Sequence, residues 1–138
     1  MLTAIDTNIV SALWSKEPAS EDIANLLFTC KNEGGLLVAA PVYVELLAYP
    51  NATKAFVDNF LETTDIQVYF VLEESIWQQA GKAFAEYAQR RRRAKSGQPK
   101  RLPVDFLVGA HALTKADRLL TLDKKRYLTS FPNLTLLP

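Results

Sequence analysis

The stretch Leu2-Thr3-Ala4-Ile5-Asp6-Thr7-Asn8 decides the fold, because it joins a short apolar strand to the start of a helix. Leu2–Ile5 is predicted to be the first strand, and a helix is expected from about Thr7 to Ser15. Asp6 lies at the junction between them. In an open parallel sheet, ligands bind outside the carboxyl ends of the strands, so this position favours a functional side chain. A helix cap is the other interpretation of Asp6, because aspartate is a common N-cap.

The rest of the chain alternates apolar runs with helical stretches, which is typical of a mainly parallel sheet of four to five strands covered by helices on both faces. Further strands are predicted at Leu36–Ala39, Ile66–Val71, Leu119–Leu122 and, at an edge, Leu134–Leu137. Further helices are predicted from Pro18 and Ser20 to the turn at 32–35, from Pro41 to Ala48, over Ala52–Leu61, from Glu74, over Pro103–Thr114, and as a turn at Lys124–Leu128. The long helix from Glu74 is expected to fade into the arginine run and a flexible loop at Ala94–Pro99.

The length of 138 residues and a hydrophobic content of 49% fit one α/β domain over residues 1–138. The single cysteine, Cys30, excludes an internal disulfide and fits a reducing compartment. No run approaches the roughly 20 apolar residues that cross a bilayer. Between Met1 and Asp6 there is no room for a signal peptide. We therefore expect a cytoplasmic protein without a membrane segment.

The charge is unevenly distributed along the chain. Residues 82–101 hold eight of the sixteen basic residues and one of the fifteen acids, which leaves +7 there and −6 elsewhere. Such asymmetry indicates a polyanionic partner, most simply nucleic acid, although a solvated loop is the alternative.

Three further acids stand in unusual surroundings. Glu45 lies in Val42–Ala48, a helix that is apolar almost all round, and a buried unpaired carboxylate is unfavourable. A bound cation would relieve it, and so would an arginine partner or a partly exposed face. Asp105 stands in the first turn of its helix, followed by the small residues Gly109 and Ala112, which would allow close packing on the sheet. Asp123 is predicted to end a strand, where it is also a plausible cap.

Together with Asp6, these acids would place two carboxylates at strand ends and two on helices that converge on the same edge. Like charges repel unless a positive charge lies among them. Oxygen-rich clusters suit Mg²⁺ or Mn²⁺, whereas no Cys/His spacing indicates zinc.

Four segments in this order resemble the PIN-domain family, specifically its VapC-like toxins, over nearly the whole chain. They are Ile5–Asn8, Val44–Leu46, Leu102–Ala112 and Ala116–Asp123. The resemblance implies a three-layer α/β/α PIN fold and a Mg²⁺- or Mn²⁺-dependent endoribonuclease. It also implies a homodimer and a cognate antitoxin that inserts a segment into the active-site groove. Its metal and catalytic residues would be Asp6, Glu45, Asp105 and Asp123, with accessory roles for Asn8 and Thr121.

The expected chemistry is hydrolysis of an RNA phosphodiester by a water that the metal orients and acidifies. The basic segment Arg90–Arg101 is a departure from shorter family members, and it is expected to contact the RNA backbone. Asp6→Asn is expected to abolish cleavage and to leave the fold intact. The predicted backbone contacts are Arg90, Arg91, Arg92, Arg93, Lys95, Lys100 and Arg101.

His111 lies six positions after Asp105, hence on another helix face, and is expected to be a packing residue rather than a ligand. Trp14 and Trp77 are expected in the core or a dimer interface rather than as platforms for bases. A haloacid-dehalogenase-like phosphatase is disfavoured, because Asn8 stands where its second aspartate is needed. An inactive PIN-like module that binds RNA or protein, and an RNA-maturation nuclease without an antitoxin, stay as alternatives.

Overall fold

Five short strands form one all-parallel sheet in the order β3-β2-β1-β4-β5 in the computed structural model, which describes residues 1–138. The predicted parallel sheet of four to five strands is therefore confirmed. β1 is central and lies between β2 and β4, so its carboxyl end has a neighbouring strand end on either side. The strands are β1 (Thr3–Ile5), β2 (Leu36–Ala39), β3 (Ile66–Tyr69), β4 (Arg118–Leu120) and β5 (Leu136–Leu137).

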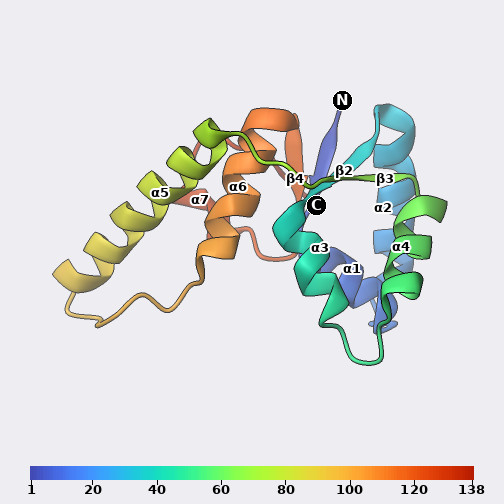
Figure 1. Ribbon diagram of the computed structural model, residues 1–138, viewed down its shortest axis with the longest axis horizontal. Coiled ribbons are helices and arrows are strands. Elements are labelled where there is room, and N and C mark those ends of the chain that lie inside the picture. The colour runs from blue at the N-terminus through green and yellow to red at the C-terminus, as the bar shows by residue number, and fades with distance from the viewer.

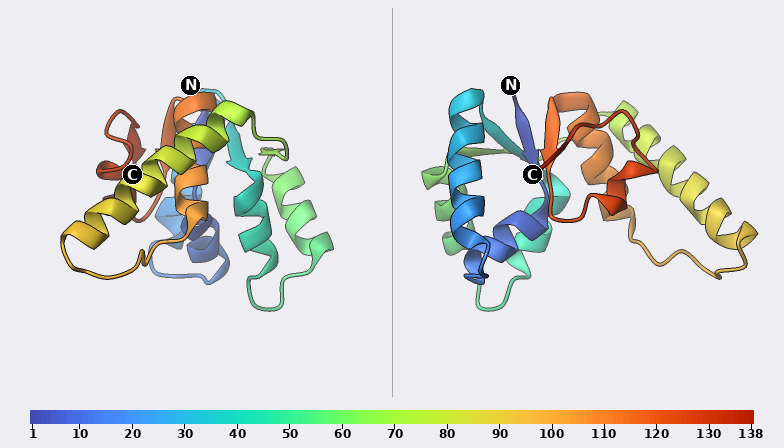
Figure 2. Two further views of the ribbon diagram at one scale, coloured as in Figure 1. Left: turned by 60° about the vertical axis from the view of Figure 1, so that its left-hand side comes forward. Right: turned by 180° about the vertical axis from the view of Figure 1, so that it is seen from behind.

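Helices cover both faces of this sheet, which confirms the predicted layering (Figure 1). On one side α2 packs against β2 and α1. On the other, α6 packs against β2 and β4 and is itself covered by α5. Figure 2 shows the same layers from two further directions. The helices are α1 (Thr7–Trp14), α2 (Ser20–Glu33), α3 (Ala40–Leu47), α4 (Lys54–Thr63), α5 (Glu74–Arg93), α6 (Pro103–Lys115) and α7 (Lys125–Leu128).

The core forms where these layers meet. All residues of β1 and β2 are buried, as is the apolar part of β4, since helices cover both faces of these strands. Fully buried side chains such as Ile5, Leu37 and Leu119 each contribute roughly 1.5–3 kcal/mol to folding. No helix has both the length and the apolar character that crossing a bilayer requires.

Two element boundaries differ from the prediction. α5 does not fade before the arginines but continues through them to Arg93 and projects from the body of the molecule (Figure 1). Arginine is a good helix former, and basic residues suit the negative end of the helix dipole. β4 ends at Leu120, so the predicted strand end at Asp123 is wrong. Thr121 follows the strand instead, and Asp123 lies in the loop before α7.

Gly109 has a different role from the one predicted. A Cβ atom at this position would overlap the ring of Phe131, which comes from the chain segment after α7. The glycine therefore makes room for that aromatic ring rather than for the sheet. Ala112 is fully buried.

Candidate functional site

Asp6 is buried at the carboxyl end of β1, where it also caps α1. Its Oδ1 accepts a hydrogen bond from the backbone N–H of Thr7 at 2.8 Å. Its own backbone N–H donates to the carbonyl of Leu120 at 3.0 Å, which continues the pairing of β1 with β4. The cap and the strand-end position, the two interpretations open from sequence, therefore hold for the same residue.

Side chains from distant parts of the chain donate to the second carboxylate oxygen of Asp6. The hydroxyls of Thr121 and Tyr127 each lie 2.8 Å from Oδ2, and the amide of Asn8 lies 3.5 Å away. Burial, and then the negative charge of Asp6, raise the pKa of Tyr127, so its hydroxyl stays protonated and acts as a donor. Sequence reasoning missed Tyr127, because an aromatic residue after a strand gives no sign of which carboxylate it reaches.

Asn8 and Thr121 join the two strand ends around Asp6. Asn8 Oδ1 accepts from the backbone N–H of Leu122 at 3.0 Å, and Asn8 Nδ2 lies 3.4 Å from Thr121 Oγ1. Thr121 Oγ1 also accepts from the backbone N–H of Asp123 at 3.1 Å. Both residues thus hold the loop after β4 against the start of α1, which is an arrangement that orients the carboxylate of Asp6.

Glu45 lies on α3 and reaches the same edge through Thr7. The Thr7 hydroxyl donates to Glu45 Oε1 at 2.6 Å, one residue from Asp6. Of the three alternatives open from sequence, the exposed face holds for Glu45, because its side chain is exposed. The buried face of α3 consists of Val42 and Leu46, so part of its apolar surface, including Val44, faces outward beside Glu45.

Asp105 and Asp123 share one arginine, Arg126 of α7. Arg126 Nη1 lies 3.3 Å from Asp105 Oδ1, and Nη2 lies 3.3 Å from Asp123 Oδ2. Burial raises the pKa of Asp105 above its ordinary value, although Arg126 and Arg101 act against this shift. Burial disfavours the charge of Arg126, but Asp105, followed by Asp6, raises its pKa overall. Arg126 was also missed from sequence, where it is one of several basic residues near the C-terminus.

The chemistry of these side chains fits a hard divalent cation, because all four acids are oxygen donors on one edge of the sheet. No three acidic, histidine or cysteine side chains converge closely enough to hold an ion in this arrangement. The positive charge among the carboxylates is instead the guanidinium of Arg126. Asp105 and Asp123 thus flank a cationic group, and the charge of Asp6 acts on it without direct contact.

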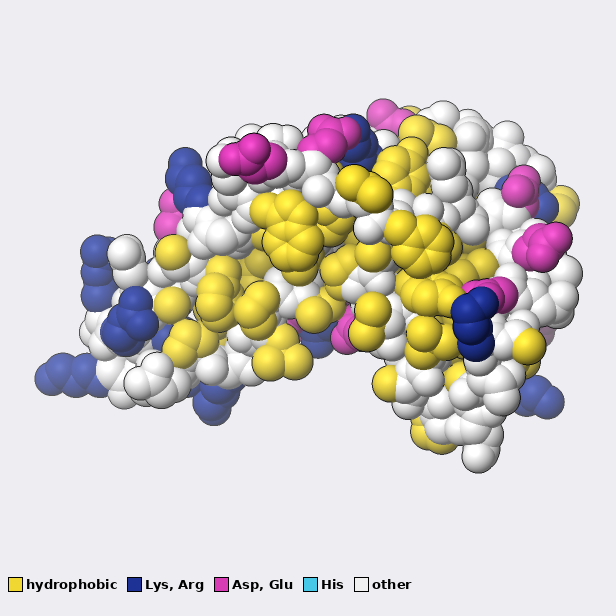
Figure 3. Space-filling view, in the orientation of Figure 1, with side chains coloured by type: hydrophobic (Ala, Val, Ile, Leu, Met, Phe, Trp, Pro, Cys, Tyr) yellow, Lys and Arg dark blue, Asp and Glu magenta, His cyan; other side chains and the backbone are white.

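The basic residues predicted to contact RNA fall into two places. The last turn of α5 exposes Arg90, Arg92 and Arg93. Basic side chains gather at this end of the molecule, on the left in Figure 3. The loop that follows exposes Lys95 and Lys100. Arg91 donates to the carbonyls of Ser96 and Gln98 and so holds that loop.

Of these basic residues, Arg101 is the one that lies beside an acid of the candidate site. Its Nε lies 3.6 Å from Asp105 Oδ2, and its guanidinium lies over the rings of Tyr87 and Phe106. The Tyr87 hydroxyl accepts from the backbone N–H groups of Lys100 and Arg101, which ties the end of the basic segment to the site.

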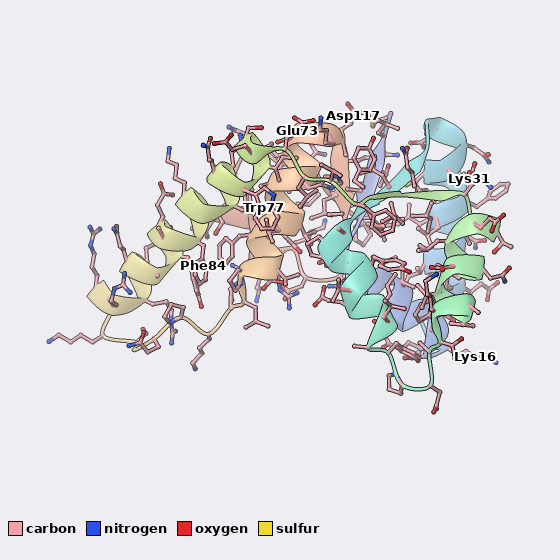
Figure 4. All side chains as sticks on the ribbon, viewed as in Figure 1. Lys16, Lys31, Glu73, Trp77, Phe84 and Asp117 are labelled. Atoms are coloured by element: carbon pink, nitrogen blue, oxygen red, sulfur yellow. The ribbon has the colours of Figure 1, made fainter.

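The histidine and the two tryptophans lie outside the acidic edge. His111 is buried with its ring centroid 5.1 Å from that of Tyr69, and it takes no part in the acidic edge. Trp14 packs against Tyr49, Phe56 and Phe60 at the border of the core. Trp77 differs, since 54% of it is exposed on the first turns of α5 (Figure 4).

An apolar groove opens beside Glu45. Val44, Phe70 and Trp77 are its most exposed side chains, and Pro41 and Leu107 lie deeper. Figure 3 shows this face as a broad hydrophobic area between the basic tip and α4. The groove thus places an acidic side chain at the rim of an apolar surface.

Comparison with known proteins agrees with this architecture. The family model described as "PIN domain" matches residues 3–131, and no curated protein matches the chain. Three solved structures align with 99% of the chain. One of them is VapBC2 from Rickettsia felis, bound to a DNA fragment from its promoter, which is 22% identical to this chain. The alignment covers 98% of the VapBC2 chain, with a TM-score of 0.71. VapBC-1 from nontypeable Haemophilus influenzae is 19% identical, with 97% of its own chain aligned and a TM-score of 0.64. DNA-bound VapBC from Salmonella typhimurium is 20% identical, with 98% of its own chain aligned and a TM-score of 0.60. Because the family model spans nearly the whole sequence, this chain belongs to the PIN-domain family.

Proposed function

We propose that this protein is a Mg²⁺- or Mn²⁺-dependent endoribonuclease and the VapC-like toxin of a toxin–antitoxin pair. The observation that carries the proposal is the position of Asp6, which is buried at the carboxyl end of the central strand of a PIN fold. Thr7, the next residue, donates to Glu45, and Arg126 contacts both Asp105 and Asp123. In parallel α/β sheets this is the edge where ligands bind. The similarity to VapBC structures supports the assignment to a toxin.

The four acids, Asn8 and Thr121 each have a part in the proposed hydrolysis. Asp6, Glu45 and Asp105 would hold the metal, and Asp123 would complete the set directly or through water. When bound, the metal would lower the pKa of a water and stabilise charge on the phosphate. Asn8 and Thr121 would hold the carboxylate of Asp6 in position, as their hydrogen bonds indicate.

The partners of this site follow from its surroundings. The groove of Val44, Phe70 and Trp77 supports binding of an apolar antitoxin segment beside Glu45. An antitoxin with a basic side chain at that point could also pair with the acid and block the edge. The homodimer and the cytoplasmic location stay predictions.

Glu45→Gln offers the sharpest test of the nuclease, because Glu45 is exposed and its replacement should leave the fold unchanged. Protein separated from any co-purifying partner would be incubated with total cellular RNA, with Mg²⁺ or with EDTA. We expect cleavage by the wild type with Mg²⁺ only, and roughly a hundredfold less by Glu45→Gln, since even groups that support a ligand contribute 10–100-fold. Glu62→Gln, an exposed acid on α4, is the matched control and should retain activity. RNA bound but not cut by the wild type would favour an inactive binding module.

The exposed arginines of α5 should supply RNA affinity without sequence information. Replacing Arg90, Arg92 and Arg93 with Gln should weaken RNA binding and lower the slope of log Kd against log salt by about 2, because each phosphate contact releases counterions. Arg91 is kept, since it holds the loop. Fluorescence anisotropy at several salt concentrations measures both quantities.

The matched control for these arginines replaces three exposed lysines with Gln, namely Lys16 and Lys31 (Figure 4) and Lys54 on α4. All three lie far from the end of α5 (Figure 1). An equal loss of slope in both triple variants would mean that only net charge matters, and that the helix tip makes no particular contact with RNA.

A further inference from the structure

Arg126 occupies a position that the proposed nuclease mechanism does not use. Its two terminal nitrogens contact carboxylates from different elements, with Nη1 3.3 Å from Asp105 on α6 and Nη2 3.3 Å from Asp123 in the loop after β4. Its backbone N–H also donates to Asp123 Oδ1 at 3.3 Å. The side chain is about one-third exposed, so solvent can reach it. One guanidinium therefore links two of the four acids of the edge.

The charges around Arg126 explain why it lies there. Asp105 is mostly buried, Asp123 is adjacent to it across the guanidinium, and Asp6 is close enough to act on both Asp105 and Arg126. Three carboxylates without a cation would repel one another and weaken the fold. A planar guanidinium can satisfy two of them at once, which a single ammonium group does less well.

The same contacts oppose a second cation. Asp105 Oδ1 and Asp123 Oδ2 face Arg126, so an ion held by these oxygens would compete with its guanidinium. No three acids converge in this arrangement. A guanidinium and a divalent ion on the same carboxylates would also repel each other.

We infer that Arg126 is an internal counterion, which holds Asp105 and Asp123 in the cation-free protein and which a divalent cation must displace from them. This inference rests on the proposed function, because it takes these acids as cation ligands. It assigns Arg126 a positioning role: the residue preserves the acidic edge when no ion is bound and lowers the affinity of the edge for the ion.

Mn²⁺ binding measured by calorimetry tests the competition. Arg126→Gln should bind Mn²⁺ about tenfold more tightly than the wild type, since two partly exposed ion pairs no longer have to be broken. Arg126→Lys separates displacement from charge, because lysine keeps the charge but cannot bridge both carboxylates. It should bind more tightly than the wild type, although less tightly than Arg126→Gln. Lys125 is the neighbouring residue, is exposed and forms no ion pair. The Mn²⁺ affinity of Lys125→Gln should therefore stay within about twofold of the wild type.

Two further measurements do not depend on a variant's affinity. In EDTA, Arg126→Gln should melt at a lower temperature than the wild type and than Lys125→Gln, because Asp123 has lost its cationic partner and Asp105 keeps only Arg101. In the wild type, the guanidinium resonance of Arg126, assigned by its absence from Arg126→Lys, should shift as Mg²⁺ is added.

The outcomes separate this inference from the proposed function. Equal Mn²⁺ affinity in the wild type, Arg126→Lys and Arg126→Gln, with an unchanged guanidinium resonance, would overturn the role of Arg126 and leave the metal site standing. Tighter binding by Arg126→Gln alone would also overturn it, because charge without displacement would then account for the effect. Absence of Mn²⁺ binding from all of these proteins would overturn the proposed function itself.

Discussion

Replacing Asp6 with asparagine is expected to abolish RNA cleavage and, in addition, to lower the free energy of unfolding by about 2–4 kcal/mol. As a ligand residue alone, Asp6 would be exchanged without effect on the fold, which is the expectation from sequence. The structure changes that expectation, because Asp6 is buried and accepts from Thr7, Thr121, Tyr127 and Asn8. An amide in its place would turn one acceptor into a donor that faces other donors, and a buried unsatisfied group is costly.

Urea unfolding of Asp6→Asn beside Glu45→Gln distinguishes the two contributions of Asp6. Glu45→Gln should lose activity with an unchanged free energy of unfolding, since Glu45 is exposed and makes one side-chain hydrogen bond. Tyr127→Phe, which removes one donor to Asp6 and keeps the carboxylate, should cost about 1–2 kcal/mol. If Asp6→Asn were as stable as the wild type, the hydrogen bonds around Asp6 would not contribute to folding as argued.

The second large effect concerns stability in acid, through His111. Its ring is buried against Tyr69, and Nε2 has no hydrogen-bond partner. Burial, with a smaller contribution from Lys115, lowers the pKa of His111 from 6.5 to about 4. The unfolded chain therefore takes up a proton below pH 6.5, while the folded chain does so only near pH 4. Stability from this residue is complete above pH 6.5 and is lost as the pH falls toward 4, up to about 3 kcal/mol.

His111→Gln removes this titration and keeps a polar side chain of similar size. The free energy of unfolding, measured by urea denaturation from neutral pH down to about pH 4, should fall less steeply in the variant than in the wild type. Because the other titrating groups are common to both proteins, the difference between the two curves reports His111. Parallel curves would show that the buried imidazole takes up its proton without cost.

Much of the architecture was predictable because its causes are local. Short apolar runs bounded by turn residues predicted the strands at Leu36–Ala39 and Ile66–Val71, and the structure has strands at both places. The junction at Asp6 was predictable in the same way, since a strand end and a helix cap both depend on residues that are neighbours in the sequence. The end of α5 was predicted wrongly, although the helix propensity of arginine and the helix dipole are also local; what the sequence did not reveal is that Arg91 turns back to the carbonyls of Ser96 and Gln98.

The sequence by itself determined the α/β class and the order of strands and helices along the chain, because apolar runs and turn residues are properties of neighbouring residues. That the four acids form one metal site stays a prediction. Only the tertiary structure decided that Glu45 is exposed, that Tyr127 donates to Asp6 across the sheet, and that Arg126 lies between Asp105 and Asp123. Asp6 and Tyr127 are 121 positions apart in the chain. Such contacts depend on how helices pack against a finished sheet, and no local pattern of residues contains that information.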